Sequence, residues 1–285
     1  IRDSYSCLIA KYWFESISGV PTHAELASEF RYRSPVLNKD DLLVFVSQSG
    51  ETADTLAAIQ LAKQQGAHVF GVCNVVGSSI ARETDSGAYT HAGPEIGVAS
   101  TNAFTAQLTV LTLIAMLVGK KKGQLSAQRF SRLLVELNAI PNKVQKLLVQ
   151  DARIKEIARH FVNNENALYL GRGVNFPVAL EGALKLKEIS YIHAEGYPSA
   201  EMKHGPIALI DEEMPVFFIA TADDVYEKIV SNIQEVKARG GRLVALVSSG
   251  NQDLKQLAEF VIEVPKTDQA LAPLLTVVPL QLLSY

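Results

Sequence analysis

The sequence predicts an α/β protein with two subdomains, each a parallel sheet flanked by helices. Short apolar runs alternate with longer segments of helical periodicity, a pattern typical of parallel sheets with helices on both faces. Residues 42–46 and 216–220 are wholly apolar, as expected of strands that are covered on both sides. The chain has 285 residues, of which 48% are hydrophobic, and this length suits two domains better than one.

The first subdomain is expected to span residues 1–140. Its predicted helices repeat apolar residues three and four positions apart, and its predicted strands are short apolar runs. The helices are residues 6–18, 53–65 and 101–118, and the strands are residues 22–25, 42–46 and 69–73. A polar helical stretch, 126–138, leads to Pro141 and to another helix at 143–148. Because proline interrupts a helix, we expect the link between the subdomains there.

The second subdomain is expected to span residues 141–285 and to repeat the alternation. Its strands are predicted at 167–170, 216–220, 243–247 and 260–264. Its helices are predicted after residue 178, at 225–239, at 253–258 and from about 280. The two halves share a plan of strand, small-residue turn and helix, but their identity is too weak to prove a duplication. Binding loops of such sheets lie at the carboxyl ends of strands, where residues 47–52 and 171–173 fall.

Composition and charge narrow the range of partners. A net charge of −3 argues against nucleic acid or an anionic membrane as the main partner. The two cysteines cannot form a disulfide framework, and the six histidines lack metal-ligand spacing, so no metal and no cofactor are expected. The most hydrophobic helix, 103–118, contains several threonines and a glutamine. We interpret it as a core helix of a cytoplasmic protein that has no signal peptide.

A hydroxyl-rich turn, Ser47-Gln48-Ser49-Gly50-Glu51-Thr52, follows the first apolar strand and opens a helix. Unpaired N–H groups and the positive end of a helix dipole attract an anion at such a place, and the hydroxyls add further donors. The lysine of GxxxxGK-Ser/Thr and the glycines of GxGxxG are missing, which favours a phosphate monoester over a nucleotide. The alternative is a plain helix N-cap, although four hydrogen-bonding side chains exceed what capping requires.

A second polar set lies in the second subdomain. On a helix, Glu181, Lys185 and Glu188 fall on one stripe at i, i+4 and i+7, and His204 follows where the chain must bend. A carboxylate, an ammonium and an imidazole that lie close together can transfer protons. The same charge spacing is also typical of a solvent-exposed helix, and taken alone it favours that alternative.

Two further loops offer polar groups. Arg172 lies between two glycines and either contacts a phosphate or ties two loops together through a carboxylate. Residues 95–101, Glu-Ile-Gly-Val-Ala-Ser-Thr, open the helix that follows. They either cap that helix through Ser100 or Thr101, or present N–H groups and a hydroxyl to a sugar.

These motifs resemble a known family. The strings SQSGETADT, EIGVAST, LGRG, EGALKLKEISYIHAE and KHGP are similar, in this order, to the sugar-isomerase half of the glucosamine-6-phosphate synthases, the glutamine:fructose-6-phosphate aminotransferases (isomerizing). The resemblance covers nearly the whole chain and implies two tandem sugar-isomerase (SIS) subdomains of flavodoxin-like, doubly wound topology. It implies an enzyme that converts fructose 6-phosphate and ammonia to glucosamine 6-phosphate, the start of amino-sugar (UDP-GlcNAc) synthesis.

The resemblance also implies roles for individual residues. The residues implied to hold the phosphate and the sugar are Ser4, Ser47, Gln48, Ser49, Thr52, Val98 and Ser100. The glutamate that matches Glu188 moves a proton between C1 and C2, with the lysine that matches Lys185 beside it. The histidine that matches His204 assists ring opening and reaches the site from the neighbouring subunit of a homodimer.

The chain departs from the family in several places. Nothing matches the glutamine-hydrolysing domain, and Asp3 beside Ser4 would repel a nearby phosphate. No residue up to Tyr285 matches the tail lysine that forms a Schiff base with the open-chain sugar, and Asn102 stands where a lysine is common. We therefore expect a truncated isomerase domain that binds the sugar and turns over poorly. The alternatives are a stand-alone isomerase or deglycase of the same fold, and a non-catalytic phosphosugar sensor, although no DNA-binding segment is visible.

Overall fold

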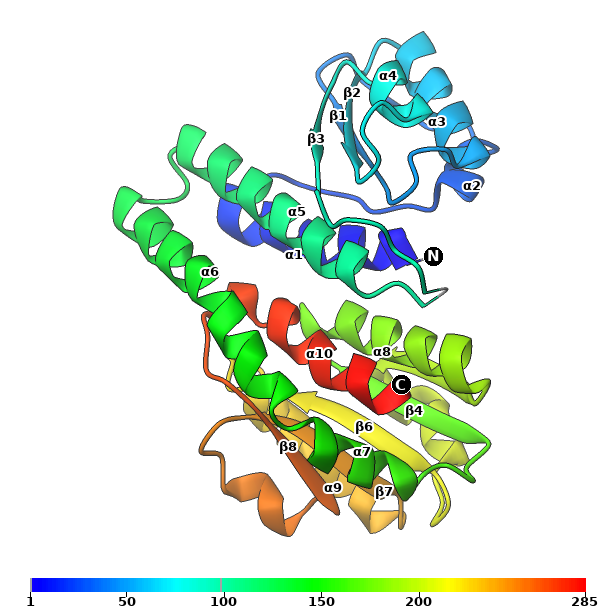
Figure 1. The fold of residues 1–285 in the computed structure, drawn as a ribbon, viewed down its shortest axis with the longest axis vertical. Coiled ribbons are helices and arrows are strands. Elements are labelled where there is room, and N and C mark those ends of the chain that lie inside the picture. Colours follow the sequence, from blue (N-terminus) through cyan, green and yellow to red (C-terminus); the bar gives the residue numbers. More distant parts are fainter. Residues whose placement is uncertain (1, 98) are drawn as a thin grey trace. The chain divides into compact units, whose positions relative to one another are not determined.

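The computed structural model describes residues 2–97 and 99–285 (Figure 1). The chain divides into two compact units, Ile1–Leu125 and Ser126–Tyr285. Both units are α/β structures with a parallel sheet, so the predicted fold class is confirmed. Each unit is described below by itself.

Unit 1 is built on three parallel strands in the order β1–β2–β3. β1 (Leu42–Ser47) pairs with β2 (His68–Cys73), and β3 (Ser86–Tyr89) lies on the other side of β2. The helices are α1 (Arg2–Ser18), α2 (Ala27–Phe30), α3 (Ala53–Gln64), α4 (Ser79–Glu83) and α5 (Asn102–Lys121). α1 packs along α5, and Ser18 Oγ donates a hydrogen bond to the Ala115 carbonyl between them (2.7 Å).

Unit 2 is built on five parallel strands in the order β5–β4–β6–β7–β8. The strands are β4 (Asn166–Gly171), β5 (His193–Pro198), β6 (Pro215–Ala220), β7 (Arg242–Ser248) and β8 (Phe260–Val264). The α-helices are α6 (Ala127–Leu148), α7 (Asp151–Arg159), α8 (Asn175–Ser190), α9 (Tyr226–Ala238) and α10 (Pro273–Ser284), and the short 3-10 helices are η1 (Glu201–His204), η2 (Pro206–Leu209), η3 (Asp253–Gln256) and η4 (Gln269–Leu271). Every residue of β6 is buried, which explains its continuous apolar run.

The same order of elements occurs in both units. β1, α3, β2, α4, β3 and α5 follow one another in unit 1. In unit 2, β6, α9, β7, η3 and β8 follow one another, and α10 comes next after the short η4. In each series the strands lie side by side in chain order. α1 packs on α5 as α8 packs on α10. The structure therefore supports the internal repeat that sequence identity alone was too weak to prove.

The predicted strands at 42–46, 69–73, 167–170, 216–220, 243–247 and 260–264 are confirmed. The strand expected at 22–25 is wrong, because these residues form an irregular segment after Pro21. The two helices expected around Pro141 are one helix, α6, which runs through the proline at the loss of one backbone hydrogen bond. The units divide instead at Leu125/Ser126, where Ser126 Oγ caps α6 by accepting a hydrogen bond from Arg129 N–H (3.2 Å).

Of the described helices, α5 is the one long and apolar enough to cross a membrane. Half of its apolar window is buried inside the structure, and α1 packs along it. The threonines that interrupt it, such as Thr112, bond back to the helix carbonyls (Thr112 Oγ1 to Leu108 O, 2.7 Å). These features are typical of the core helix of a globular unit.

Candidate active site

The hydroxyl-rich turn, residues 47–52, begins at the end of β1 and leads into α3. Ser47 is only 2% exposed, and its Oγ accepts a hydrogen bond from Gly50 N–H (3.0 Å) and lies 3.5 Å from Thr52 Oγ1. Thr52 stands at the N-cap position of α3, yet its side chain makes no capping hydrogen bond in the described structure. The plain N-cap is therefore wrong for this turn, because the α3 N-terminus keeps N–H groups without a side-chain cap, as an anion site requires.

Gly50 and Glu51 fix the shape of this turn. Gly50 has φ +67°, and a Cβ there would lie 2.0 Å from Ser78 Oγ, so no other residue fits without a shift. The Glu51 carboxylate accepts a hydrogen bond from Ser79 N–H at the start of α4 (2.7 Å). Hydrogen bonding to Ser79 lowers the pKa of Glu51. The one carboxylate of the turn is thus engaged with α4 and serves to hold the loop in place.

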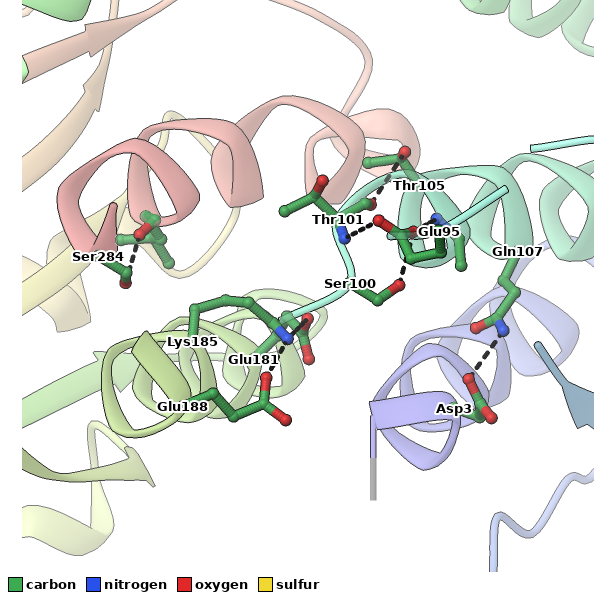
Figure 2. A network of polar contacts seen from close by, with 12 residues as sticks. Asp3, Glu95, Ser100, Thr101, Thr105, Gln107, Glu181, Lys185, Glu188 and Ser284 are labelled. Atoms are coloured by element: carbon green, nitrogen blue, oxygen red, sulfur yellow. Dashed lines mark hydrogen bonds and ion pairs between the residues drawn. The ribbon is translucent and has the colours of Figure 1, made fainter. Parts of the chain in front are cut away.

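The loop before α5 is organised by a residue that sequence reasoning missed. Ser100 is buried, and its Oγ donates to the Glu95 carboxylate (2.7 Å), which also accepts from Thr101 N–H (3.3 Å) and Ala103 N–H (2.9 Å) (Figure 2). Glu95 therefore caps α5, and neither hydroxyl does. The available signal was a carboxylate placed before a polar loop that opens a helix. Val98, predicted to line the sugar, lies outside the described residues.

Ser4 is half-buried in the first turn of α1. The neighbouring Asp3 carboxylate accepts a hydrogen bond from Gln107 Nε2 on α5 (2.8 Å), and Ser6 Oγ bonds to Gln107 Oε1 (3.0 Å) (Figure 2). Asp3, which we expected to disturb a nearby phosphate, is therefore tied to a neutral amide and links α1 to α5.

In unit 2, α8 brings Glu181, Lys185 and Glu188 together (Figure 2). Lys185 Nζ lies 2.7 Å from Glu188 Oε2 and 3.4 Å from Glu181 Oε1. The side chains of Lys185 and Glu181 are 0% exposed, and that of Glu188 is 26% exposed. A solvent-exposed helix face, the alternative that charge spacing alone favoured, is therefore wrong. We call these three residues the α8 ion set.

The burial of the α8 ion set explains why its members are paired. A buried ammonium costs several kcal/mol unless carboxylates compensate it, and here one cation serves two of them. α8 packs on β4, β5 and α10, so the helix is held in place on several sides. Glu188 is the member that reaches solvent and can therefore meet a small molecule. A carboxylate held by an ammonium and partly shielded from water is suited to act as a general base.

His204 ends η1 and is exposed. In the part of the chain that the structure describes, its imidazole makes no hydrogen bond or ion pair, whereas the adjacent Lys203 pairs with Glu235 on α9 (2.5 Å). Within a single chain, therefore, no polar contact between described residues joins His204 to the α8 ion set. The Arg172 guanidinium likewise has no carboxylate partner among the described residues, so the proposed tie between two loops is not seen.

The turn of unit 2 that corresponds to residues 47–52 has a different chemistry. β6 is followed by Thr221-Ala222-Asp223-Asp224-Val225. Thr221 Oγ1 accepts a hydrogen bond from Asn175 Nδ2 (3.0 Å), and Asp223 accepts one from Val225 N–H (3.0 Å). Burial raises the pKa of Asp223. With two carboxylates in place of hydroxyls, this turn disfavours a phosphate, so unit 1 holds the better candidate.

The described residues contain no group of three or more His, Cys, Asp or Glu side chains that could hold a metal ion. Cys7 and Cys73 are free thiols. Burial raises the pKa of Cys7 to about 12 and also raises the pKa of Cys73. Neither cysteine therefore supplies a reactive thiolate near neutral pH.

The family model of the SIS domain matches residues 2–117 and residues 160–285. The chain belongs to the SIS domain family. The first matched segment lies within unit 1 and the second within unit 2, in agreement with the repeated order of elements. The two tandem SIS subdomains that the motifs predicted are thereby confirmed.

The chain is also similar to individual proteins. The glutamine–fructose-6-phosphate aminotransferase (isomerizing) of Chlorobaculum tepidum is 59% identical over 278 residues, which are 98% of this chain and 45% of that protein. The protein of the same name from Bacteroides thetaiotaomicron is 55% identical over 278 residues, again 98% of this chain and 45% of the relative. The chain thus spans less than half the length of these relatives.

Solved structures are also similar to this chain. The C-terminal domain of glucosamine-fructose-6-phosphate aminotransferase from Francisella tularensis matches with a TM-score of 0.96 and 44% identity, over 100% of this chain and 81% of that chain. Glucosamine-6-phosphate deaminase from Thermotoga maritima matches with a TM-score of 0.80 and 24% identity, over 100% and 82% of the two chains, and shares the fold. The resemblance that the sequence motifs indicated is confirmed.

Proposed function

We propose that the chain is the phosphosugar isomerase domain of a glucosamine-6-phosphate synthase. It binds fructose 6-phosphate and converts it with ammonia to glucosamine 6-phosphate, the start of amino-sugar (UDP-GlcNAc) synthesis. The observation that carries this proposal is the buried α8 ion set, because a fold that merely binds a phosphosugar has no need of an ion-paired base. The 59% identity to a protein named for this activity supports it.

Unit 1 is proposed to hold the phosphate and the sugar. The open N-terminus of α3 and the hydroxyls around it offer donors to a dianionic phosphate. Glu95 fixes the Ser100 hydroxyl by a hydrogen bond of 2.7 Å, which gives the sugar a donor or acceptor of set direction. The proposed binding residues are Ser4, Ser47, Gln48, Ser49, Thr52, Val98 and Ser100.

Unit 2 is proposed to supply the proton transfer. Ammonia adds to C2 of the open-chain ketose and water leaves, which produces an imine. Glu188 removes a proton from C1 and returns it to C2 through an enolamine, while the C1 hydroxyl gives up its proton and the nitrogen gains one, leaving an aldehyde at C1 and an amine at C2. Lys185 holds Glu188 at 2.7 Å and balances the charge of the site. His204 opens the furanose ring, since an imidazole can donate and accept a proton near neutrality.

The working form is proposed to be a cytoplasmic homodimer in which His204 reaches the site of the neighbouring subunit. The exposure of His204 and its lack of a polar partner among the described residues support this arrangement. Nucleic acid and membranes are not proposed as partners, in keeping with the net charge of −3.

The 285 residues contain no match to the family's Schiff-base lysine, so we propose that by themselves they bind the sugar but turn over slowly. The test uses three measurements on the wild-type chain and on Glu188→Gln: the melting temperature with fructose 6-phosphate, glucosamine 6-phosphate formation, and solvent-deuterium exchange at C1 by NMR. We expect both proteins to melt at higher temperature with the sugar, and exchange to occur in the wild type alone. Equal exchange in both proteins, or wild-type-like synthase turnover by the chain alone, would contradict these proposals.

The same measurements, with the melting temperature also taken with glucose 6-phosphate and glucosamine 6-phosphate, separate the two alternatives. A phosphosugar sensor would show the rise in melting temperature without any exchange at C1. A stand-alone isomerase or deglycase would be stabilised more by a phosphosugar other than fructose 6-phosphate or glucosamine 6-phosphate, because the rise follows affinity.

A further inference from the structure

An open groove of about 620 Å³ lies in unit 2, among α6, the start of α7 and the segments that follow β7 and β8. Four cationic side chains line it, Lys143, Lys146, Arg153 and Lys266, against one carboxylate, Glu263. The chain as a whole carries a net charge of −3, so this is a local excess of positive charge on an acidic protein. None of the residues proposed above to bind or convert the sugar lines it. We call it the basic groove.

The floor of the basic groove is fixed by hydrogen bonds to the edge strand β8. Gln150 Nε2 donates to the Glu263 carbonyl (3.0 Å), and Arg153 Nη2 donates to the Val261 carbonyl (2.8 Å). α6 and α7 lie beside β8 (Figure 1). These bonds cover the open edge of the sheet and hold the first turn of α7 against it. The groove therefore has a set shape, and it lies toward the carboxyl ends of the strands, where parallel sheets bind ligands.

The one carboxylate of the groove is already compensated. Glu263 Oε1 lies 3.6 Å from Lys255 Nζ, and Glu263 Oε2 accepts a hydrogen bond from Gly250 N–H (3.3 Å). Its charge therefore offsets a cation outside the lining and repels an incoming anion less than a free carboxylate would.

The cations of the groove are engaged to different degrees. Lys143 Nζ is held by Glu136 (2.6 Å), and Arg153 is bonded to β8. Lys146 and Lys266 are exposed, and over residues 2–97 and 99–285 neither has a hydrogen-bond or ion-pair partner. Two ammonium groups are thus available to an anion, with two anchored cations beside them.

We propose that the basic groove binds a small organic molecule with a diphosphate group. A diphosphate carries more negative charge than a single phosphate monoester and can engage both available ammonium groups, and Arg153 adds a guanidinium to the same lining. The volume of about 620 Å³ exceeds what a single phosphate ion needs and falls in the range of small-molecule sites. All of its lining residues belong to unit 2, whereas the hydroxyl-rich turn of residues 47–52 belongs to unit 1.

Calorimetric titration of the full chain with inorganic pyrophosphate tests this proposal. Saturating fructose 6-phosphate is present in the titrations of the wild type and of the lysine variants, so that the turn of unit 1 is occupied. We expect saturable binding by the wild type and at least tenfold weaker binding by the double variant Lys146→Gln/Lys266→Gln, which loses two charge-assisted contacts. The matched control is Lys39→Gln/Lys228→Gln, which removes two exposed lysines elsewhere and keeps the wild-type affinity. All four positions are exposed, so folding is expected to be unaffected.

The other outcomes overturn the proposal. Unchanged affinity in Lys146→Gln/Lys266→Gln means that pyrophosphate does not occupy the groove. An equal loss in the control means that net charge alone attracts it. A loss confined to Ser47→Ala/Ser49→Ala, measured without fructose 6-phosphate, means that it binds the turn of unit 1. Equal affinity for orthophosphate excludes the diphosphate class.

Discussion

Removal of the Lys185 ammonium is predicted to destabilise unit 2 strongly. Lys185→Met retains most of the apolar stem but leaves the Glu181 carboxylate, which is 0% exposed, without the cation 3.4 Å away. Breaking a buried ion pair in this way costs about 3–5 kcal/mol in the free energy of unfolding, because a buried carboxylate loses a nearby cation. Glu188 adds little to that loss, since its 26% exposure allows water to solvate it.

Urea unfolding followed by far-UV circular dichroism measures this effect. With slopes of about 1–3 kcal/mol/M for small proteins, the midpoint falls by about 1 M or more. Trp13 is the single tryptophan and is buried in unit 1, so its fluorescence reports that unit separately. Lys187→Met on the same helix is the matched control: Lys187 is exposed, and we expect a change within about 0.5 kcal/mol.

A double variant tests the reasoning further. Glu181→Gln/Lys185→Met removes both charges at once, and we expect it to recover most of the stability that Lys185→Met loses. If Lys185→Met lowers the free energy of unfolding by less than about 1 kcal/mol, as Lys187→Met is expected to do, then loss of the Lys185 ammonium does not leave a destabilising buried charge. If the double variant is less stable than the single one, the ion pair stabilises the fold by itself and the argument from desolvation is refuted.

Three further predictions concern pH, the phosphosugar turn and the α5 cap. Burial alone would raise the pKa of Asp268, but the hydrogen bonds from Arg129 and from Ala270 N–H, together with the charges of Arg129 and Arg132, hold that pKa below its ordinary value. The Arg129–Asp268 pair therefore stabilises unit 2 above about pH 4, and this contribution is lost as pH falls through the folded pKa of Asp268. A pH series of melting temperatures measures the loss. We expect Arg129→Gln to remove this dependence of the melting temperature on pH. Gly50→Ala meets both positive φ and a Cβ contact of 2.0 Å, so we expect it to abolish the rise in melting temperature caused by fructose 6-phosphate. Gly66→Ala, at φ +83° in open space, costs only about 1–2 kcal/mol and keeps that rise. Glu95→Gln weakens the cap of α5, and we expect the dissociation constant of fructose 6-phosphate to increase about tenfold; an unchanged constant would contradict a positioning role.

Six of the described strands could be predicted from sequence because a short apolar run dominates each of them. Two strands at the edges of the sheets, β3 and β5, could not. β5 reads His-Ala-Glu-Gly-Tyr-Pro and β3 reads Ser-Gly-Ala-Tyr, and neither has the apolar run or the alternation that marks a strand. Their conformation is imposed by pairing with a neighbouring strand, which is a tertiary interaction and leaves no local pattern.

The candidate site shows the same division. The turn of residues 47–52 was visible because its chemistry is local: a strand, hydroxyls and a helix start within a few residues. The burial of Lys185 was not visible, because the i, i+4 spacing of charges is the same on exposed and buried helices. Glu95 was missed for a related reason, since the cap of α5 comes from a side chain several residues before the helix.

The repeated fold divides the required chemistry between its two copies. Unit 1 has a hydroxyl-rich turn after β1, whereas the corresponding turn of unit 2 carries Asp223 and Asp224. Unit 2 has a buried lysine and a base on α8, whereas α1, which packs on α5 as α8 packs on α10, contributes no buried ion pair among its described contacts. Neither copy therefore has both a hydroxyl-rich turn and a buried ion set among its described residues. Under the proposed function we therefore expect substitutions in the turn of residues 47–52 to act mainly on the dissociation constant of the phosphosugar, and Glu188→Gln to act on the rate of proton transfer with binding retained.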